Sequence, residues 1–205
     1  MVSSLIPDCK ELRVYRVNIE QAAEILGGKF QVLAPSFKSL LEKIDVKKGT
    51  KVLDIGTGDG KLAIALALKG FLVLTGEPRG DTSKYAKQNW HENASKVKVD
   101  HHIKFQHFSA ENLPFDDEKF DYVSLYGSFH HFEHKKKAIQ EILRVLKNQG
   151  KIILIEPNDQ MMQKIRATHP DHPDADDPRK YLGDFAVKVD FYQFDKVNAF
   201  IIKKI

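Results

Sequence analysis

One stretch of the sequence, residues 51–62, combines an acidic side chain with three glycines in a pattern that could hold a ligand. An apolar run before the glycines predicts a central buried strand, and Asp54 is the polar residue within it. Burying a carboxylate costs free energy unless donors or a ligand satisfy it, so Asp54 requires a partner. Gly56, Gly58 and Gly60 let the backbone turn sharply and approach a ligand closely, and the helix predicted after them would offer free amides to an anionic group.

Taken alone, this glycine pattern has two interpretations. It fits a tight strand-to-helix turn that binds nothing, and it fits a nucleotide-binding loop. Nucleotide dehydrogenases use Gly-x-Gly-x-x-Gly and place their acid after the second strand, whereas this chain has Asp-x-Gly-x-Gly-x-Gly. The stretch resembles the first motif of the class I S-adenosylmethionine (SAM) dependent methyltransferases. The resemblance extends over five motifs and about residues 35–205, and it is strongest to the type-11 branch that contains quinone-biosynthesis C-methyltransferases.

The second and third motifs of this family are also present. Glu77 follows a strand predicted over residues 71–75, at the edge where open α/β sheets bind ligands, and the resemblance assigns its carboxylate to the ribose hydroxyls of SAM. Pro78 departs from the turn that many relatives have there. Ser109 stands where the family usually has the aspartate that borders the adenine, so we expect weaker adenine recognition or a substitute acceptor such as Glu111.

The fourth motif is a strand predicted over residues 121–126, followed by a loop that the resemblance places beside the methionine part of SAM. The aromatic faces of Tyr126 and Phe129 could attract the sulfonium cation there. The fifth motif ends at Pro157. The resemblance implies that the cofactor is held by Asp54, Gly56, Thr57, Gly58, Gly60, Glu77, Pro78, Ser109, Ala110, Glu111, Tyr126, Gly127 and Ser128.

No residue is assigned to catalysis with comparable support. His130 and His131 are candidate general bases, because a neutral imidazole titrates in the useful range. A metal site made of His130, His131 and His134 is disfavoured, since adjacent histidines point in different directions and no carboxylate is evident as a third convergent ligand. Glu156 and the residues after it resemble part of a magnesium site, but the matching acid is missing. We therefore predict no metal.

The predicted architecture is an α/β fold with a seven-stranded doubly wound sheet, mostly parallel with an antiparallel last strand. Residues 1–48 form a helical lead-in or cap and residues 49–205 the SAM-binding domain, within one structural domain overall. In the lead-in, Asn18 and Gln21 form a capping box for a first helix, and a second helix follows Pro35.

Two further segments carry predictions. A helix is predicted over about residues 82–94. The His-, Pro- and Asp-rich segment 168–182 is predicted to be a loop with a role as a lid, and a metal-binding tract is the less favoured interpretation. Two antiparallel strands follow it.

Composition limits the function classes. The chain has 205 residues, 42% of them hydrophobic and 29% charged, a net charge of +4 and one cysteine, Cys9. These values predict a cytoplasmic globular protein with no intrachain disulfide, no membrane insertion and no cysteine-based zinc site.

The resemblance implies that the protein transfers the methyl group of SAM to a small-molecule acceptor and releases S-adenosylhomocysteine. RNA methylation and a catalytically inactive, partner-binding SAM fold are the alternatives, and the oligomeric state is left open.

Overall fold

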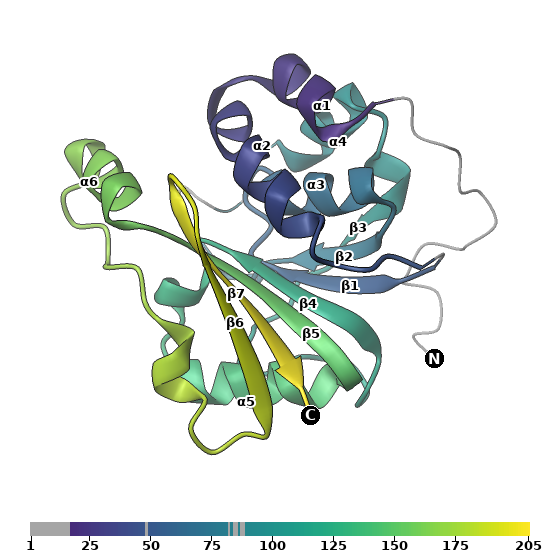
Figure 1. Ribbon diagram of the computed structural model, residues 1–205, viewed down its shortest axis with the longest axis vertical. Helices are drawn as coiled ribbons and strands as arrows, with labels where there is room; N and C mark the ends of the chain where they lie inside the picture. Colours follow the sequence, from purple (N-terminus) through teal and green to yellow (C-terminus); the bar gives the residue numbers. More distant parts are fainter. Residues whose placement is uncertain (1–16, 48, 82, 84–85, 87–88) are drawn as a thin grey trace. The chain divides into compact units, whose positions relative to one another are not determined.

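The computed structural model describes residues 17–205 except 48, 82, 84–85 and 87–88 (Figure 1). Contacts between residues divide the chain into two compact units, Met1–His107 and Phe108–Ile205. Cys9 lies outside the described residues. Each unit is described by itself.

The first unit contains a three-stranded parallel part of the sheet in the order β3-β2-β1. Its strands are β1 (Lys51–Ile55), β2 (Leu72–Gly76) and β3 (Ile103–Phe105). The apolar run that predicts β1 is buried, as expected for a strand covered on both faces. The register pairs Asp54 with Thr75, so two polar side chains lie next to each other near the carboxyl ends of β1 and β2.

The described residues of the same unit also form helices. They are α1 (Ile19–Leu26), α2 (Gly28–Leu41), α3 (Lys61–Lys69) and α4 (Trp90–Lys96), and a short turn of 3-10 helix, η2 (Asp100–His102), precedes β3. The predicted capping box is confirmed: the Asn18 side chain accepts from the Gln21 amide at 2.8 Å, and the Gln21 side chain accepts from the Asn18 amide at 3.0 Å.

The second helix begins earlier than the sequence predicted. It starts at Gly28 and contains Pro35, which the sequence analysis took as the residue before the helix. An internal proline removes one helical hydrogen bond and costs about 3 kcal/mol or more. The buried side chains of Phe30, Leu33 and Phe37 lie on one face of this helix, and their packing outweighs that cost.

The helix predicted over residues 82–94 is also displaced. The described helix α4 runs from Trp90 to Lys96. Of residues 82–89 the structure describes Ser83, Ala86 and Asn89, and none of them is helical. Among the described residues before Trp90, Ala86 is buried without being helical.

The second unit contains the other four strands, β4 (Phe120–Tyr126), β5 (Leu146–Pro157), β6 (Val187–Gln193) and β7 (Val197–Lys204). Strands β4 and β5 are parallel, whereas β7 pairs antiparallel with both β5 and β6. The two predicted C-terminal strands are therefore confirmed, and Figure 1 shows them as the last elements of the chain. The helical elements of this unit are α5 (Lys135–Val145), α6 (Asp159–Thr168), η3 (Phe129–His131) and η4 (Pro178–Tyr181).

The fold class agrees with the prediction. The strand order is β3-β2-β1-β4-β5-β7-β6 in a seven-stranded sheet, mostly parallel and with antiparallel pairing at β7. None of the described helices is long and apolar enough to cross a membrane.

Candidate functional site

The glycine loop after β1 adopts backbone conformations that side chains disfavour. The φ angles are 92° at Gly56, 50° at Gly58 and 84° at Gly60. Residues with a Cβ rarely adopt such angles, so the three glycines of the motif are required by the path of the backbone. Gly60 is the N-cap residue of α3, which places the start of that helix directly at the loop.

Asp54 has the partner that its burial requires. The residue is 2% exposed. Oδ2 of its carboxylate accepts a hydrogen bond from the Thr75 hydroxyl at 2.8 Å. The Thr75 hydroxyl also lies 2.9 Å from the hydroxyl of Thr57. Because Thr75 gives its single proton to Asp54, Thr57 must be the donor to Thr75. The carboxylate therefore orients a chain of hydroxyls that reaches into the glycine loop.

Glu77 lies at the carboxyl end of β2 and is also tied to this loop. The residue is 7% exposed, and its Oε1 accepts a hydrogen bond from the Gly58 amide at 2.7 Å. An ionised carboxylate can accept about four hydrogen bonds, so this contact is compatible with further acceptance from hydroxyls of a ligand. The structure thus brings together Asp54, Thr57, Gly58 and Glu77 within the first unit.

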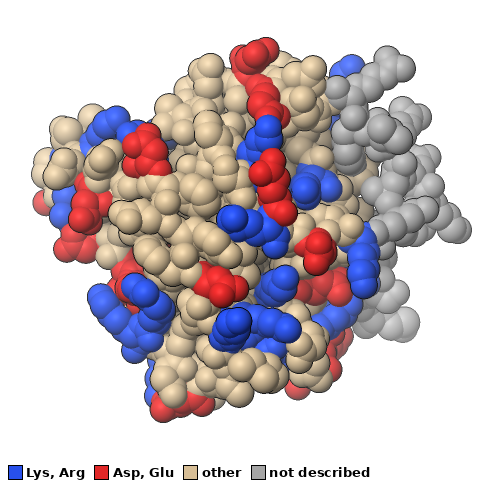
Figure 2. Space-filling view, viewed as in Figure 1, with Lys and Arg blue, Asp and Glu red and all other residues tan. Residues whose placement is uncertain are grey.

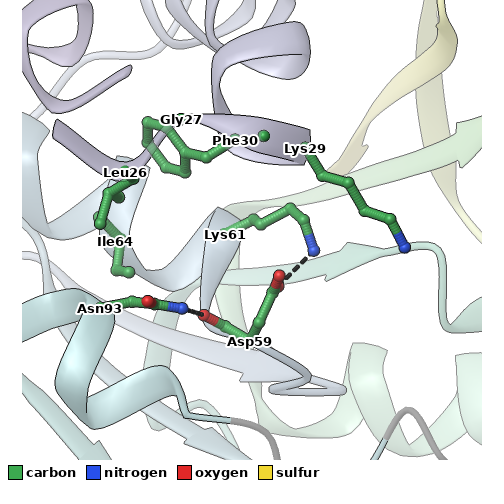
Figure 3. A pocket seen from close by; sticks show the side chains of 9 residues that line it. Leu26, Gly27, Lys29, Phe30, Asp59, Lys61, Ile64 and Asn93 are labelled. Carbon is green, nitrogen blue, oxygen red and sulfur yellow. Dashed lines mark hydrogen bonds and ion pairs between the residues drawn. The ribbon is translucent and has the colours of Figure 1, made fainter. Parts of the chain in front are cut away.

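A pocket opens beside the same loop in the first unit (Figure 3). Asp59 and Lys61 form an ion pair in it, and the Asn93 side chain donates to the Asp59 carbonyl at 3.0 Å. Burial lowers the pKa of Lys61 below its usual range despite the attraction of Asp59, and the charge of Lys29 adds to the lowering. Lys29 and Phe30 line this pocket from helix α2, so the N-terminal helices border the glycine loop.

Replacing Gly60 by alanine is expected to destabilise the first unit. The new Cβ would lie 3.0 Å from the Trp90 Cβ, and the φ of +84° would be strained. Such strain costs about 1–3 kcal/mol, to be measured as a loss in the free energy of unfolding in denaturant. Gly80→Ala is the matched control, because a Cβ there meets no atom within 4 Å. Equal stability of the two variants would contradict this account of the loop.

In the second unit, the residues assigned to the adenine contact one another. The Ser109 hydroxyl donates to Oε2 of Glu111 at 2.8 Å, and the His134 amide is 3.3 Å from Oε1 of the same carboxylate. Burial opposes ionisation of Glu111, but these hydrogen bonds outweigh it and lower its pKa. Glu111 therefore brings a negative charge next to Ser109, where the family usually has an aspartate.

An arginine that the sequence analysis did not select holds the segment after Glu111. Arg144 of α5 donates to the Leu113 carbonyl at 2.9 Å and to the Phe115 carbonyl at 2.7 Å. Glu141, one turn earlier, accepts from the Leu113 amide at 2.9 Å and pairs with Arg144. In the sequence, Glu141 and Arg144 look like an ordinary ion pair between positions i and i+3 on a helix surface. Nothing in that spacing indicates that both side chains bind a backbone segment nearly thirty residues away.

The loop after β4 starts with Gly127, whose φ is 59° and whose amide donates to the Ile155 carbonyl at 2.9 Å. Tyr126 and Ser128 on either side are partly exposed. Phe129 is fully buried and packs edge-on against Phe132 and Tyr181, so it belongs to the core of this unit. Of the two aromatic residues suggested for the sulfonium, Tyr126 is the accessible one.

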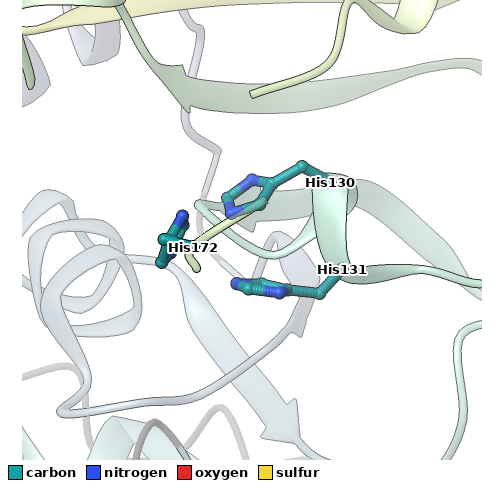
Figure 4. A group of neighbouring side chains, drawn as sticks. All are labelled: His130, His131 and His172. Carbon is teal, nitrogen blue, oxygen red and sulfur yellow. The ribbon is translucent and has the colours of Figure 1, made fainter. Parts of the chain in front are cut away.

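The histidines after this loop are arranged differently from the sequence expectation. His130 Nδ1 lies 2.5 Å from Oε2 of Glu156 in β5, and both side chains are almost completely buried. His172, from the segment after α6, joins His130 and His131, and the three present ligand nitrogens within 4.8 Å of one another (Figure 4). His134 is not in this group. The sequence could not show this cluster, because 41 positions separate His131 from His172.

Asn158, two residues after Glu156, has a structural role. Its side chain caps α6 by accepting from the Met161 amide at 3.1 Å, and it donates to the carbonyls of Phe194 and Asp195 at 3.1 and 2.9 Å. These contacts occupy both ends of the amide. The partial likeness of this stretch to a magnesium site is explained by the need to hold α6 and the β6–β7 turn.

The seven-stranded sheet, its strand order and the Asp-x-Gly-x-Gly-x-Gly loop after β1 are those of the class I SAM-dependent methyltransferase fold. Comparison with known proteins agrees, because residues 53–154 match the family described as "Methyltransferase domain" (Methyltransf_11). The chain is similar to the ubiquinone/menaquinone biosynthesis C-methyltransferase UbiE of Pseudomonas fluorescens, with 31% identity over 71% of this chain and 57% of that protein. It is also similar to the uncharacterized methyltransferase YcgJ of Bacillus subtilis, with 29% identity over 62% of this chain and 49% of that protein.

Among solved structures, a SAM-dependent methyltransferase from Aquifex aeolicus has a TM-score of 0.63 at 16% identity, covering 93% of this chain and 100% of that one. At this identity the likeness concerns the fold. The chain spans about half the length of the curated relatives named above.

Proposed function

We propose that this protein transfers the methyl group of SAM to a small-molecule acceptor. One observation carries the proposal: in the first unit, the glycine loop is held in place by Asp54 through Thr75 and by Glu77 through the Gly58 amide. The loop thereby presents its backbone, and Glu77 its carboxylate, at the carboxyl ends of β1 and β2. Ligands of open α/β sheets bind at that edge.

The residues of the first unit have distinct roles in this proposal. Glu77 accepts hydrogen bonds from the ribose hydroxyls, and the loop from Gly56 to Gly60 follows the amino-acid part of SAM. Asp54 acts through Thr75 and Thr57, by keeping the loop in its conformation. The family pattern adds Pro78, and in the second unit it adds Ser109, Ala110, Glu111, Tyr126, Gly127 and Ser128; these assignments rest on the sequence resemblance.

Methyl transfer requires little covalent chemistry from the protein itself. A nucleophilic atom of the acceptor forms a bond to the methyl carbon while the bond from carbon to sulfur breaks, and the electron pair stays on the sulfur of S-adenosylhomocysteine. Holding the two reactants in line can lower the barrier by roughly 7–11 kcal/mol. His130 and His131 stay candidates for taking a proton from the acceptor; the contact between His130 Nδ1 and Glu156 would leave Nε2 to receive it.

The face shown in Figure 2 gives no support to RNA as the acceptor. Figure 2 shows basic and acidic side chains interspersed on the face that it presents, as on a solvated surface. Nucleic-acid binding proteins gather Lys and Arg into a patch or stripe.

Because UbiE, the relative named above, is described as a quinone-biosynthesis C-methyltransferase, quinol-like rings are the first acceptors to test. The composition supports a cytoplasmic setting for the reaction, and residues 1–48 are proposed as a cap.

The proposal is tested in two steps. Calorimetric titration of the purified chain with SAM and with NAD should show binding of SAM alone. Release of S-adenosylhomocysteine should then be measured with demethylated quinols, catechols, amines and, in a separate arm, total RNA. Absence of SAM binding would overturn the methyltransferase proposal and favour a partner-binding scaffold. SAM binding with turnover on RNA alone would overturn the choice of acceptor class.

A further inference from the structure

We propose that His130, His131 and His172 form a binding site for a divalent transition-metal ion of the zinc class, with Glu156 as the carboxylate that orients His130. The sequence analysis predicted no metal because adjacent histidines point in different directions and no carboxylate was evident as a third ligand. In the structure His172 supplies that ligand (Figure 4). Neither the family match nor the proposed methyl transfer assigns a metal to these residues. The same Nε2 of His130 cannot hold an ion and take a proton, so in the metal-bound protein these histidines are ligands and do not act as general bases.

The three imidazoles lie close together. Ring centroids are 4.1 Å apart for His130 and His131, 5.1 Å for His130 and His172, and 5.2 Å for His131 and His172. Their ligand nitrogens all lie within 4.8 Å of one another. Nitrogens bound tetrahedrally to zinc lie about 3.3–3.4 Å apart, given a bond length of about 2.0–2.1 Å. Modest side-chain rotations of His131 and His172 would contract the group to that size.

The buried histidine is held as metal ligands usually are. The side chain of His130 is 1% exposed and that of Glu156 is 2% exposed. When Nδ1 donates to Oε2 of Glu156, the lone pair is on Nε2, and this Nε2 is buried without a hydrogen-bond partner among the described residues. A buried nitrogen without a partner has lost its hydrogen bond to water, and coordination of an ion would replace that bond. Histidine ligands generally donate their second nitrogen to a carboxylate or a carbonyl.

His172 follows the same rule. Its Nδ1 lies 2.9 Å from the carbonyl of Pro173, which can only accept, so Nδ1 carries the proton and the lone pair is on Nε2. The tautomers of both His130 and His172 are thus set by neighbouring acceptors. His131 is exposed, and this side of the group gives an ion a route in from solvent and room for a further ligand.

The donor set selects the class of ion. Imidazole nitrogens suit Zn²⁺, Cu²⁺, Ni²⁺ and Fe²⁺, whereas Mg²⁺ and Ca²⁺ prefer oxygen ligands. Three protein ligands leave one coordination position for water or another molecule, which is the arrangement of zinc sites that take part in chemistry. The His130–Glu156 pair lies after β4 and in the last part of β5, at the carboxyl edge of these parallel strands.

The test uses the full chain without an affinity tag, after treatment with a chelator. Zn²⁺ is titrated by calorimetry, and Co²⁺ is titrated by visible absorption, which reports nitrogen coordination without any enzymatic assay. We expect one ion per chain. His172→Ala should lower the affinity by more than about 100-fold, because changes to residues that merely orient ligands already cost about 10- to 100-fold. His131→Ala, at an exposed position, should have the same effect.

Two further variants make the test specific. His169→Ala is the matched control: this histidine lies three positions before His172, outside the group, and should leave the affinity unchanged. Glu156→Gln should weaken binding of the ion by about 10- to 100-fold. A cooperative thermal unfolding transition should show that this variant is folded. The proposal is overturned if neither ion binds, or if His172→Ala binds as tightly as His169→Ala. Zn²⁺ and Co²⁺ binding are measured without SAM. Failure of the metal proposal is therefore distinguishable from failure of the proposed methyl transfer.

Discussion

Glu77→Ala is expected to weaken SAM binding by about 10- to 100-fold. In our proposal the carboxylate accepts from the ribose hydroxyls, and hydrogen bonds to a charged group contribute about 1.5–3 kcal/mol. The same substitution removes the acceptor of the Gly58 amide, which lies 2.7 Å from Oε1, and so loosens the loop that borders the ligand. Calorimetric titration with SAM measures the change in affinity.

Two variants separate these contributions. Glu77→Gln keeps an oxygen for the Gly58 amide but loses the charge, so its affinity should fall between those of the wild type and Glu77→Ala. Asp81→Asn is the matched control, because Asp81 is an acid in the same connection whose side chain accepts from the Ser83 amide. Its SAM affinity should be unchanged. Unaltered binding by Glu77→Ala would refute the assignment of Glu77 to the ribose.

Arg144→Met is expected to lower the free energy of unfolding by about 2–4 kcal/mol. The guanidinium donates to the carbonyls of Leu113 and Phe115 and pairs with Glu141 and Asp117, and methionine retains the apolar stem without any donor. A hydrogen bond to a charged group contributes about 1.5–3 kcal/mol net, and less where the group is partly exposed to solvent, as Arg144 is. Denaturant unfolding measures the loss, with exposed Arg79→Met as a control expected to be neutral.

The pH dependence of stability provides a second readout for Arg144. Its hydrogen bond to Glu141 lowers the pKa of that carboxyl below the ordinary value, with burial opposing. A carboxyl whose pKa is lowered by folding contributes stability above its unfolded pKa, and this contribution is lost as the pH falls through the lower, folded value. Arg144→Met should therefore lose less stability on acidification than the wild type. An unchanged acid dependence would show that the Arg144–Glu141 pair does not form in solution.

Local patterns predicted much of the chain because their physical causes are local. The capping box of Asn18 and Gln21 depends on residues three positions apart, and the apolar run of β1 is continuous in sequence. The positive φ angles at Gly56, Gly58 and Gly60 follow from the turn that the motif must make. Predictions were wrong where packing overrode local preference, as at Pro35, which lies inside α2 because that helix buries an apolar face.

By itself, the sequence determined the fold class through its resemblance to the family's motifs. It determined the glycine loop and the acids at Asp54 and Glu77 because these depend on spacing between near neighbours. The tertiary structure alone decided which distant groups meet: Thr75 with Asp54, Arg144 with Leu113 and Phe115, and His172 with His130 and His131. These pairs are separated by roughly twenty to forty positions. Their contacts depend on strand register and on the path of connecting segments, which local patterns do not encode.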